Sequence, residues 1–156
     1  MKWRYSVFAA TLLFSSETAA IYSCNVSTTG LNFGQYRPFN LVQQDNNGNI
    51  AVSCQLLQII GLLVSYEIRL SSGQSGNYNA RQLRNAGNSL NYNLYRNAAR
   101  TNVFGNGTAG TVFIADGYLL SIGVITRNYP VYGRIPAGQN VRAGSYTDVI
   151  TITVTY

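Results

Sequence analysis

The sequence has no histidine and very few acids. Among its 156 residues only five are Asp or Glu, and the four beyond residue 20 are scattered at Asp45, Glu67, Asp116 and Asp148. Hydrolysis by paired carboxylates needs two acids a few ångströms apart, a Ser or Cys nucleophile needs a neighbouring base, and a metal site needs several His, Cys or carboxylate ligands. We therefore expect no catalytic site, no metal site and no cofactor, so the chain is not predicted to be an enzyme. The three Asp residues lie next to turn residues, where Asp commonly accepts hydrogen bonds from nearby backbone.

Charge of either sign is scarce, and long amphipathic runs are lacking. Only 10% of the residues are charged, and no window shows a sustained apolar stripe at helical spacing. Gly, Asn, Ser, Thr and Tyr are abundant instead, a composition that favours short strands and turns over helices. A chain of this length is enough for one domain with a substantial core. The composition therefore predicts a single all-β domain.

The N-terminus has the pattern of an export signal. Lys2 and Arg4 precede a short apolar run over residues 7–14, and small residues follow as far as Ala20. A membrane anchor is the alternative, but this run is far shorter than the roughly 20 apolar residues that span a bilayer. We predict a signal peptide over residues 1–20 and one mature domain over residues 21–156, which carries nine Arg and four acids.

Export places the two cysteines, Cys24 and Cys54, in an oxidising compartment. With no other cysteine in the chain, the simplest expectation is that they form one disulfide. Closing a loop of about 30 residues would stabilise the fold by roughly 3.5 kcal/mol on the chain-entropy model.

Short extended segments separated by Gly and Asn follow one another along the chain. Apolar residues alternate most clearly over residues 62–72, where Tyr66 is expected to face the core, and over residues 89–97, where Tyr92 is. Asn47-Gly48 is a strong tight-turn signal, and a second turn is expected over residues 73–77. About seven elements result, at the spacing of an antiparallel sandwich. The other expected segments are 31–36, 50–54, 111–115, 117–135 and 149–156.

The last eight residues, VITITVTY, alternate without interruption. Side chains of a strand point alternately to its two faces, so one face of this strand is rich in threonine and the other is apolar. The threonine-rich face comprises Val149, Thr151, Thr153 and Thr155, and the apolar face comprises Ile150, Ile152, Val154 and Tyr156.

Two other patterns suggest ligands that we do not expect. The string GNGTAG over residues 105–110 matches a dinucleotide-binding fingerprint, but that motif works only where its glycines open a helix. Strand-like residues follow here, so we predict a turn. The excess of basic over acidic residues suggests a nucleic-acid partner, yet the Arg residues occur singly from Arg37 to Arg142 and do not cluster. We interpret them as a solvated surface and expect no nucleic-acid partner.

Three stretches and two cysteines together resemble the spore coat protein U domain family, which includes subunits of archaic, Csu-type chaperone-usher pili. They lie at residues 27–38, 62–108 and 131–156, together with the flanking Cys24 and Cys54, and YGRIPAGQNVRAGSYTDVITITVTY is the most specific block. The resemblance covers nearly the whole predicted mature chain. One departure is visible: the family usually has Trp-Gly-Asp-Gly where this chain has FGNG, with Phe104 and Asn106 at the changed positions.

The resemblance implies an incomplete immunoglobulin-like antiparallel β-sandwich that is completed by a donor strand. It implies as partners a periplasmic pilus chaperone, an outer-membrane usher and a neighbouring pilus subunit that donates a β-strand, with the chain passing through the periplasm to the cell surface. An unpaired apolar strand edge must be covered, and strand addition can cover it. The groove residues are then expected to be Ile150, Ile152, Val154 and Tyr156.

Two expectations follow for the role of the chain. The resemblance implies an exported structural or adhesive subunit of a surface pilus. Only residues 21–23 precede Cys24 after the predicted cleavage, whereas a donor strand needs roughly ten residues at about 3.3 Å each. We therefore expect this subunit to accept a strand but to donate none, at the tip or at a terminal position. The alternative is a self-sufficient secreted domain, either a spore coat layer or a carbohydrate-binding β-sandwich.

Overall fold

The computed structural model describes residues 22–56 and 61–156, so the predicted signal peptide lies outside the described residues. These residues form eight strands and one short 3-10 helix. The expected all-β, antiparallel fold is confirmed. The elements in order are β1 (Tyr22–Thr29), β2 (Gln44–Leu56), β3 (Leu62–Leu70), η1 (Gly73–Ser75), β4 (Arg81–Asn85), β5 (Asn88–Tyr95), β6 (Ile114–Leu120), β7 (Val124–Ile135) and β8 (Ile152–Thr155).

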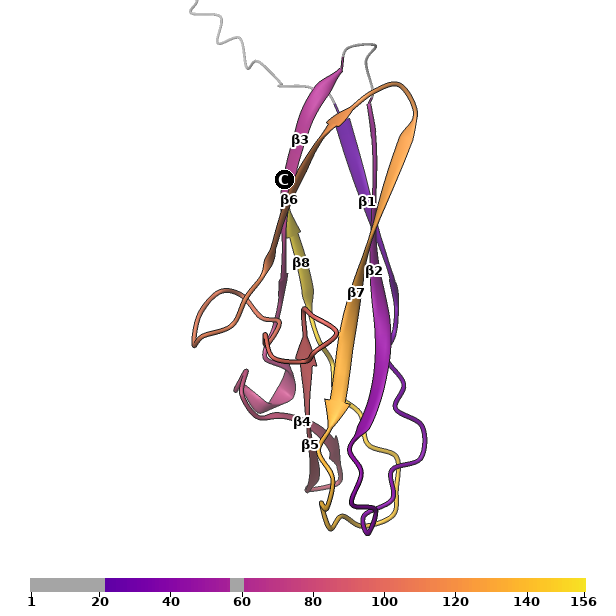
Figure 1. Ribbon diagram of the computed structural model, residues 1–156, viewed down its shortest axis with the longest axis vertical. Helices are drawn as coiled ribbons and strands as arrows, with labels where there is room; N and C mark the ends of the chain where they lie inside the picture. Colours follow the sequence, from indigo (N-terminus) through magenta and orange to yellow (C-terminus); the bar gives the residue numbers. More distant parts are fainter. Residues whose placement is uncertain (1–21, 57–60) are drawn as a thin grey trace, which may run out of the picture.

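The strands form two sheets that run along the long axis of the molecule (Figure 1). The larger sheet has the order β1-β2-β7-β5-β4, and the smaller has the order β6-β3-β8. All the strand pairs are antiparallel. Among the residues described, no helix is long and apolar enough to cross a membrane.

The core lies between the sheets and is built from alternating strand positions. In β3 the inward side chains from Val64 to Leu70 are buried, and in β5 Leu90, Tyr92 and Leu94 are buried, as the alternation predicted. Each such side chain stabilises the fold by roughly 1.5–3 kcal/mol when it leaves water. Tyr66 and Tyr129 meet inside this core, with their hydroxyl oxygens 2.5 Å apart.

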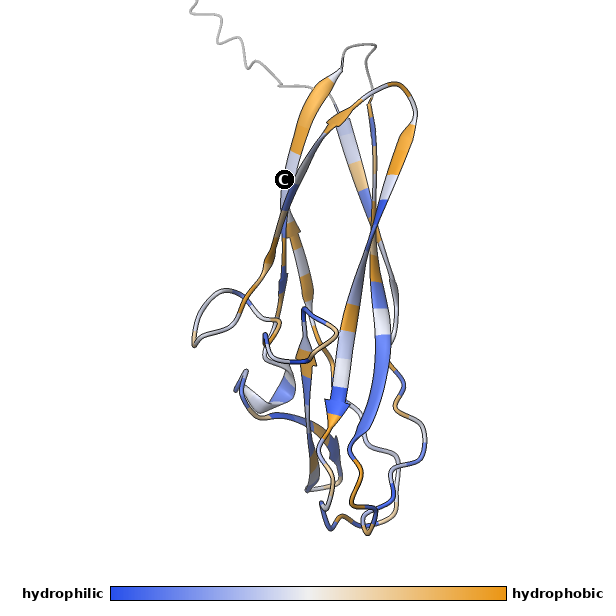
Figure 2. Cartoon of the chain, viewed as in Figure 1, coloured by the Kyte–Doolittle hydropathy of each residue, from blue (hydrophilic) through white to orange (hydrophobic). Residues whose placement is uncertain are grey.

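The expected turn at Asn47-Gly48 is wrong, because both residues lie inside β2. Asn47 is opposite Tyr132 and Gly48 is opposite Val131 in the ladder with β7. The first half of β2 is hydrophilic throughout (Figure 2). Its extended conformation is therefore stabilised by hydrogen bonding to β7 and not by burial of an apolar face. A Cβ at Gly48 would lie 2.8 Å from the carbonyl oxygen of Thr29. The glycine therefore permits a close approach to the end of β1.

Several strand boundaries also differ from expectation. The segment 117–135 is divided between β6 and β7, which belong to different sheets, and Gly123 between them has a φ of 111°. Residues 31–36 form no strand, and β8 covers only four residues of the expected eight. The turn over residues 73–77 is confirmed as η1 followed by Gly76, which has a left-handed backbone. The turn over residues 105–110 is also confirmed.

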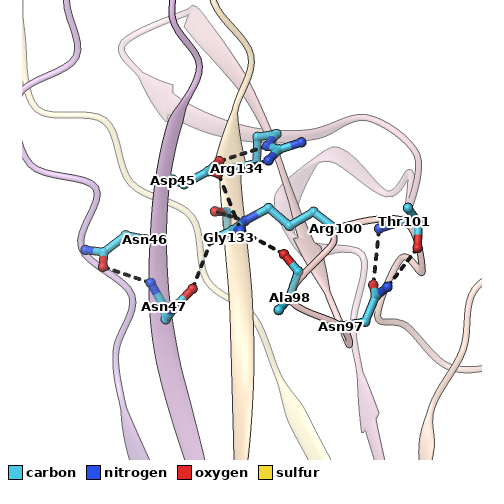
Figure 3. Close-up of polar contacts among 9 residues, drawn as sticks. All are labelled: Asp45, Asn46, Asn47, Asn97, Ala98, Arg100, Thr101, Gly133 and Arg134. Carbon is cyan, nitrogen blue, oxygen red and sulfur yellow. Dashed lines mark hydrogen bonds and ion pairs between the residues drawn. The ribbon is translucent and has the colours of Figure 1, made fainter.

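Asp45 on the outer face of the larger sheet pairs with two arginines. Asp45 accepts hydrogen bonds from Arg134 at 2.8 and 2.9 Å, and a nitrogen of Arg100 lies 3.4 Å from its carboxylate (Figure 3). The hydrogen bonds from Arg134 hold the pKa of the Asp45 carboxyl below its ordinary value. Asp45 thus pairs with arginine and not with nearby backbone. Asp116 and Asp148 do accept from the next backbone N–H, as expected.

Candidate functional site: a groove between two free strand edges

Each sheet leaves one edge strand open on the same side of the sandwich. Within the described residues, β8 pairs only with β3 and β1 pairs only with β2. The two strands approach each other at one end, where the ring centroids of Tyr22 and Tyr156 are 5.7 Å apart. Open edges expose unpaired N–H and C=O groups that can pair with a further strand.

A cavity of about 300 Å³, which we call the strand groove, separates these edges. Thr28 and Thr29 of β1 line one wall, and Ile150 and Ile152 line the other. The floor consists of buried apolar side chains from both sheets. These are Ile50, Leu70, Leu94 and Val131.

The four residues expected at the groove occupy different positions. Ile150 and Ile152 line the strand groove and are half-buried. Val154 is half-buried against the core but does not line this cavity, and Tyr156 is 59% exposed beside Tyr22. The threonine face at residues 151, 153 and 155 is exposed.

A second cavity, of about 1280 Å³, adjoins the strand groove, toward the end of the molecule that is lowest in Figure 1. This end cavity is lined mainly by residues 31–40 and 141–148, which Figure 1 shows together at that end. Four residues line both spaces: Leu31, Phe33, Leu83 and Asp148. No local pattern in the sequence indicated this cavity, because the two irregular segments that form it are about 100 residues apart.

The chain crosses from one sheet to the other immediately before β8, and polar contacts fix this crossing. Thr147 exchanges two backbone hydrogen bonds with Arg84 of β4, at 2.8 and 3.1 Å. Thr151 accepts from the backbone N–H of Ser71 at 2.9 Å and donates to its hydroxyl at 2.9 Å. The segment from residue 147 to residue 151 therefore spans the end of the sandwich and sets where β8 starts.

Asp148 lies at the centre of that crossing. Its carboxylate accepts hydrogen bonds from the Tyr92 hydroxyl at 2.7 Å and from the backbone N–H of Gln74 at 2.9 Å. Burial raises the pKa of Tyr92, and the hydrogen bond to Asp148 raises it further. A Cβ at Gly73 would collide with the same carboxylate, so the glycine makes room for it.

Arg81, expected on the solvated surface, is instead fully buried. Its guanidinium donates to the carbonyl oxygens of Ser71 and Phe104, both at 2.7 Å, and to the Asn93 side-chain oxygen at 2.8 Å. Burial lowers the pKa of Arg81. An arginine that occurs singly in the sequence has the same pattern whether it is buried or exposed, so the sequence could not reveal the burial of Arg81. Phe104 is buried too, so the altered FGNG segment contributes to the core.

Cys24 and Cys54 form a disulfide that fastens β1 to β2. They are direct partners in the strand ladder, with their Cα atoms 4.0 Å apart. Because β1 forms a wall of the strand groove, the disulfide holds that wall in place.

The groove is suited to binding and not to acid–base chemistry. Its polar lining consists of hydroxyl and amide groups and one engaged carboxylate, Asp148. No cluster of three or more His, Cys, Asp or Glu in the described part of the chain could hold a metal ion. Two open edges over an apolar floor can take up an extended segment, whose backbone pairs with an edge while alternate side chains point into the floor.

Comparisons with known proteins agree with this geometry. The family model for the Spore Coat Protein U domain matches residues 10–153. Protein U of Myxococcus xanthus is 32% identical over 133 residues, which cover 81% of this chain and 71% of that protein. A similar fold occurs in the crystal structure of the CsuC–CsuE chaperone–tip adhesion subunit pre-assembly complex from archaic chaperone-usher Csu pili of Acinetobacter baumannii. The TM-score is 0.57 at 18% identity, and the match covers 86% of this chain but only 40% of the matched chain.

Proposed function

This chain belongs to the Spore Coat Protein U domain family, and on that premise we propose that it is a non-enzymatic subunit of a surface pilus. A periplasmic chaperone fills the strand groove first, and a strand from a neighbouring subunit replaces it during assembly at an outer-membrane usher. The chain passes through the periplasm and ends at the cell surface.

The observation that carries this proposal is the open edge of β8 beside the open edge of β1. Ile150 and Ile152 stay half-buried over an apolar floor, and a further strand would complete their burial. Burying about five side chains of such a strand at roughly 1.5–3 kcal/mol each gives on the order of 10 kcal/mol before ordering costs. That is enough to hold neighbouring subunits together.

Co-expression tests this function. The full chain is exported in a bacterial host with or without the pilus chaperone of its own genome, and the periplasmic extract is analysed by size-exclusion chromatography. We expect a soluble one-to-one complex with the chaperone and degradation or aggregation without it, because the apolar groove is then uncovered. A stable soluble monomer without any partner would support the alternative of a self-sufficient coat or carbohydrate-binding domain.

We further propose that the subunit accepts a strand but donates none, at the tip or at a terminal position. Residues Tyr22–Thr29 form β1 and are paired with β2, so in this fold they are not available as a donor strand. Intact mass of the secreted chain gives its first residue. When the chain is released from its chaperone, we expect no denaturant-resistant ladder on a gel, and a ladder formed by a chain that starts near Ile21 would refute this role.

A further inference from the structure

We propose that the segment seated in the strand groove extends into the end cavity and carries acidic side chains there, which pair with Arg37 and Arg142. This inference rests on the proposed function and adds the chemistry of the partner segment. It concerns the part of the site that the sequence did not reveal.

The two spaces adjoin each other. Leu31, Phe33, Leu83 and Asp148 line both, so a segment that lies in one borders directly on the other. The end cavity, at about 1280 Å³, is larger than the roughly 300–1,000 Å³ of small-molecule pockets. A polypeptide that enters through the strand groove is therefore the occupant that suits both spaces.

The charges in the end cavity point to an acidic occupant. Arg37 and Arg142 both line it and are exposed, and neither side chain has an ion pair or a hydrogen bond within the described residues. Glu67 is paired with Arg69, and Asp116 is paired with Arg127.

The remaining acids form no ion pair with the two arginines either. Asp45 binds Arg134 and Arg100 on the outer face of the larger sheet. Asp148 lines the cavity, and Tyr92, Gln74 and Val149 donate to its two oxygens. Its negative charge offsets only one of the two arginines, so the lining keeps an excess of positive charge for the occupant.

The direction of the strands places the acidic residues at one end of the occupant. The chain leaves the end cavity at Asp148 and then runs through β8, away from it. β1 runs the opposite way along the groove, because Tyr22 at its start lies beside Tyr156 and Thr29 at its end lines the groove with Ile152. An inserted strand is therefore antiparallel to only one of the two edges. We take β8 as that partner, since antiparallel pairing is the more stable arrangement per residue. A strand antiparallel to β8 would end at the end cavity, so we assign the acidic side chains to its C-terminal end.

Three labelled synthetic peptides test the inference. Each has about ten residues that alternate between Val and Thr or Ser, to match the spacing of the groove. The first ends in two Glu residues at its C-terminus, the second has Gln in their place, and the third carries the two Glu at its N-terminus. The full chain is unfolded in guanidinium and refolded by dilution with each peptide, and fluorescence anisotropy gives the dissociation constant.

We expect all three peptides to bind, with the C-terminal Glu peptide about five- to tenfold tighter than the others at low ionic strength. This advantage should shrink in high salt, because exposed charges are screened. Arg37→Gln and Arg142→Gln should each reduce it, whereas Arg37→Lys and Arg142→Lys should retain most of it. Arg96→Gln is the matched control, because it removes one positive charge from a residue outside both cavities.

Each outcome separates the two proposals. Equal affinity of the Glu and Gln peptides, or an equal loss in the Arg96→Gln control, would overturn this inference and leave the strand groove intact. Tighter binding of the N-terminal Glu peptide would overturn the assigned direction and with it the inference as stated. Failure of all three peptides to bind would overturn the proposed function and this inference together.

Discussion

Arg81 shows how much one buried side chain can organise in this fold. It pairs with no carboxylate within residues 22–56 and 61–156, yet it binds the carbonyl oxygens of Ser71 and Phe104 and the side chain of Asn93. The sequence predicted an exposed arginine here, because a one-residue pattern carries no information about burial. Ser71 also forms hydrogen bonds with Thr151 just before β8. Arg81 therefore helps to fix the start of β8 through its bond to the Ser71 carbonyl.

Replacing Arg81 should destabilise the fold markedly. Arg81→Met would leave the carbonyl oxygens of Ser71 and Phe104 without their guanidinium donor, while the Asn93 oxygen would keep only the N–H of Leu94. Arg81→Lys would lose the planar fork that reaches all three acceptors. We expect either change to lower the free energy of unfolding by about 2–4 kcal/mol, measured by urea denaturation. Arg84→Gln, an exposed change in the same strand, should stay within about 0.5 kcal/mol. Equal effects at positions 81 and 84 would contradict the role of the buried network.

At the scale of single elements, the sequence predicted the strands with a clear two-residue period. The inward faces of β3 and β5 follow directly from that alternation. The turn predicted at Asn47-Gly48 does not form, because these residues pair with β7 instead. Gly48 also allows the close approach of Thr29. The sequence pattern also overestimated the length of β8, because residues 149–151 alternate like a strand but cross between the sheets.

The two faces of β8 should respond differently to a charge. Ile152 lies opposite Leu70 and lines the strand groove, so Ile152→Asp would bury a carboxylate without a partner. We expect this change to abolish capture by the chaperone and to cause degradation, seen as loss of the chain from periplasmic extracts. Thr153→Asp, on the exposed face of the same strand, is the matched control and should be captured nearly normally. Similar losses at the two positions would show that the groove lies elsewhere.

At the scale of the whole molecule, the site depends on contacts that no local pattern reveals. The strand groove lies between β1 and β8, which are more than 100 residues apart in the chain. Alternation in residues 149–156 predicted an apolar face, but it could not show which strand forms the opposite wall or that two irregular segments enclose the end cavity. The resemblance to the spore coat protein U domain family predicted that a groove exists, and the structure shows which residues line it.

The disulfide links the stability of the whole fold to the shape of this site. Reducing the bond, or replacing both Cys24 and Cys54 by Ser, would remove the covalent link between β1 and β2 and leave only their hydrogen-bonded ladder. We expect the free energy of unfolding to fall by about 2–5 kcal/mol in urea denaturation. Capture of a groove peptide should weaken as well, because β1 supplies the wall at Thr28 and Thr29. Ser27→Ala, an exposed change in the same strand, should alter neither property. Two free thiols in the mass spectrum of the secreted chain, or unchanged peptide capture after reduction, would show that β1 holds its place without the bond.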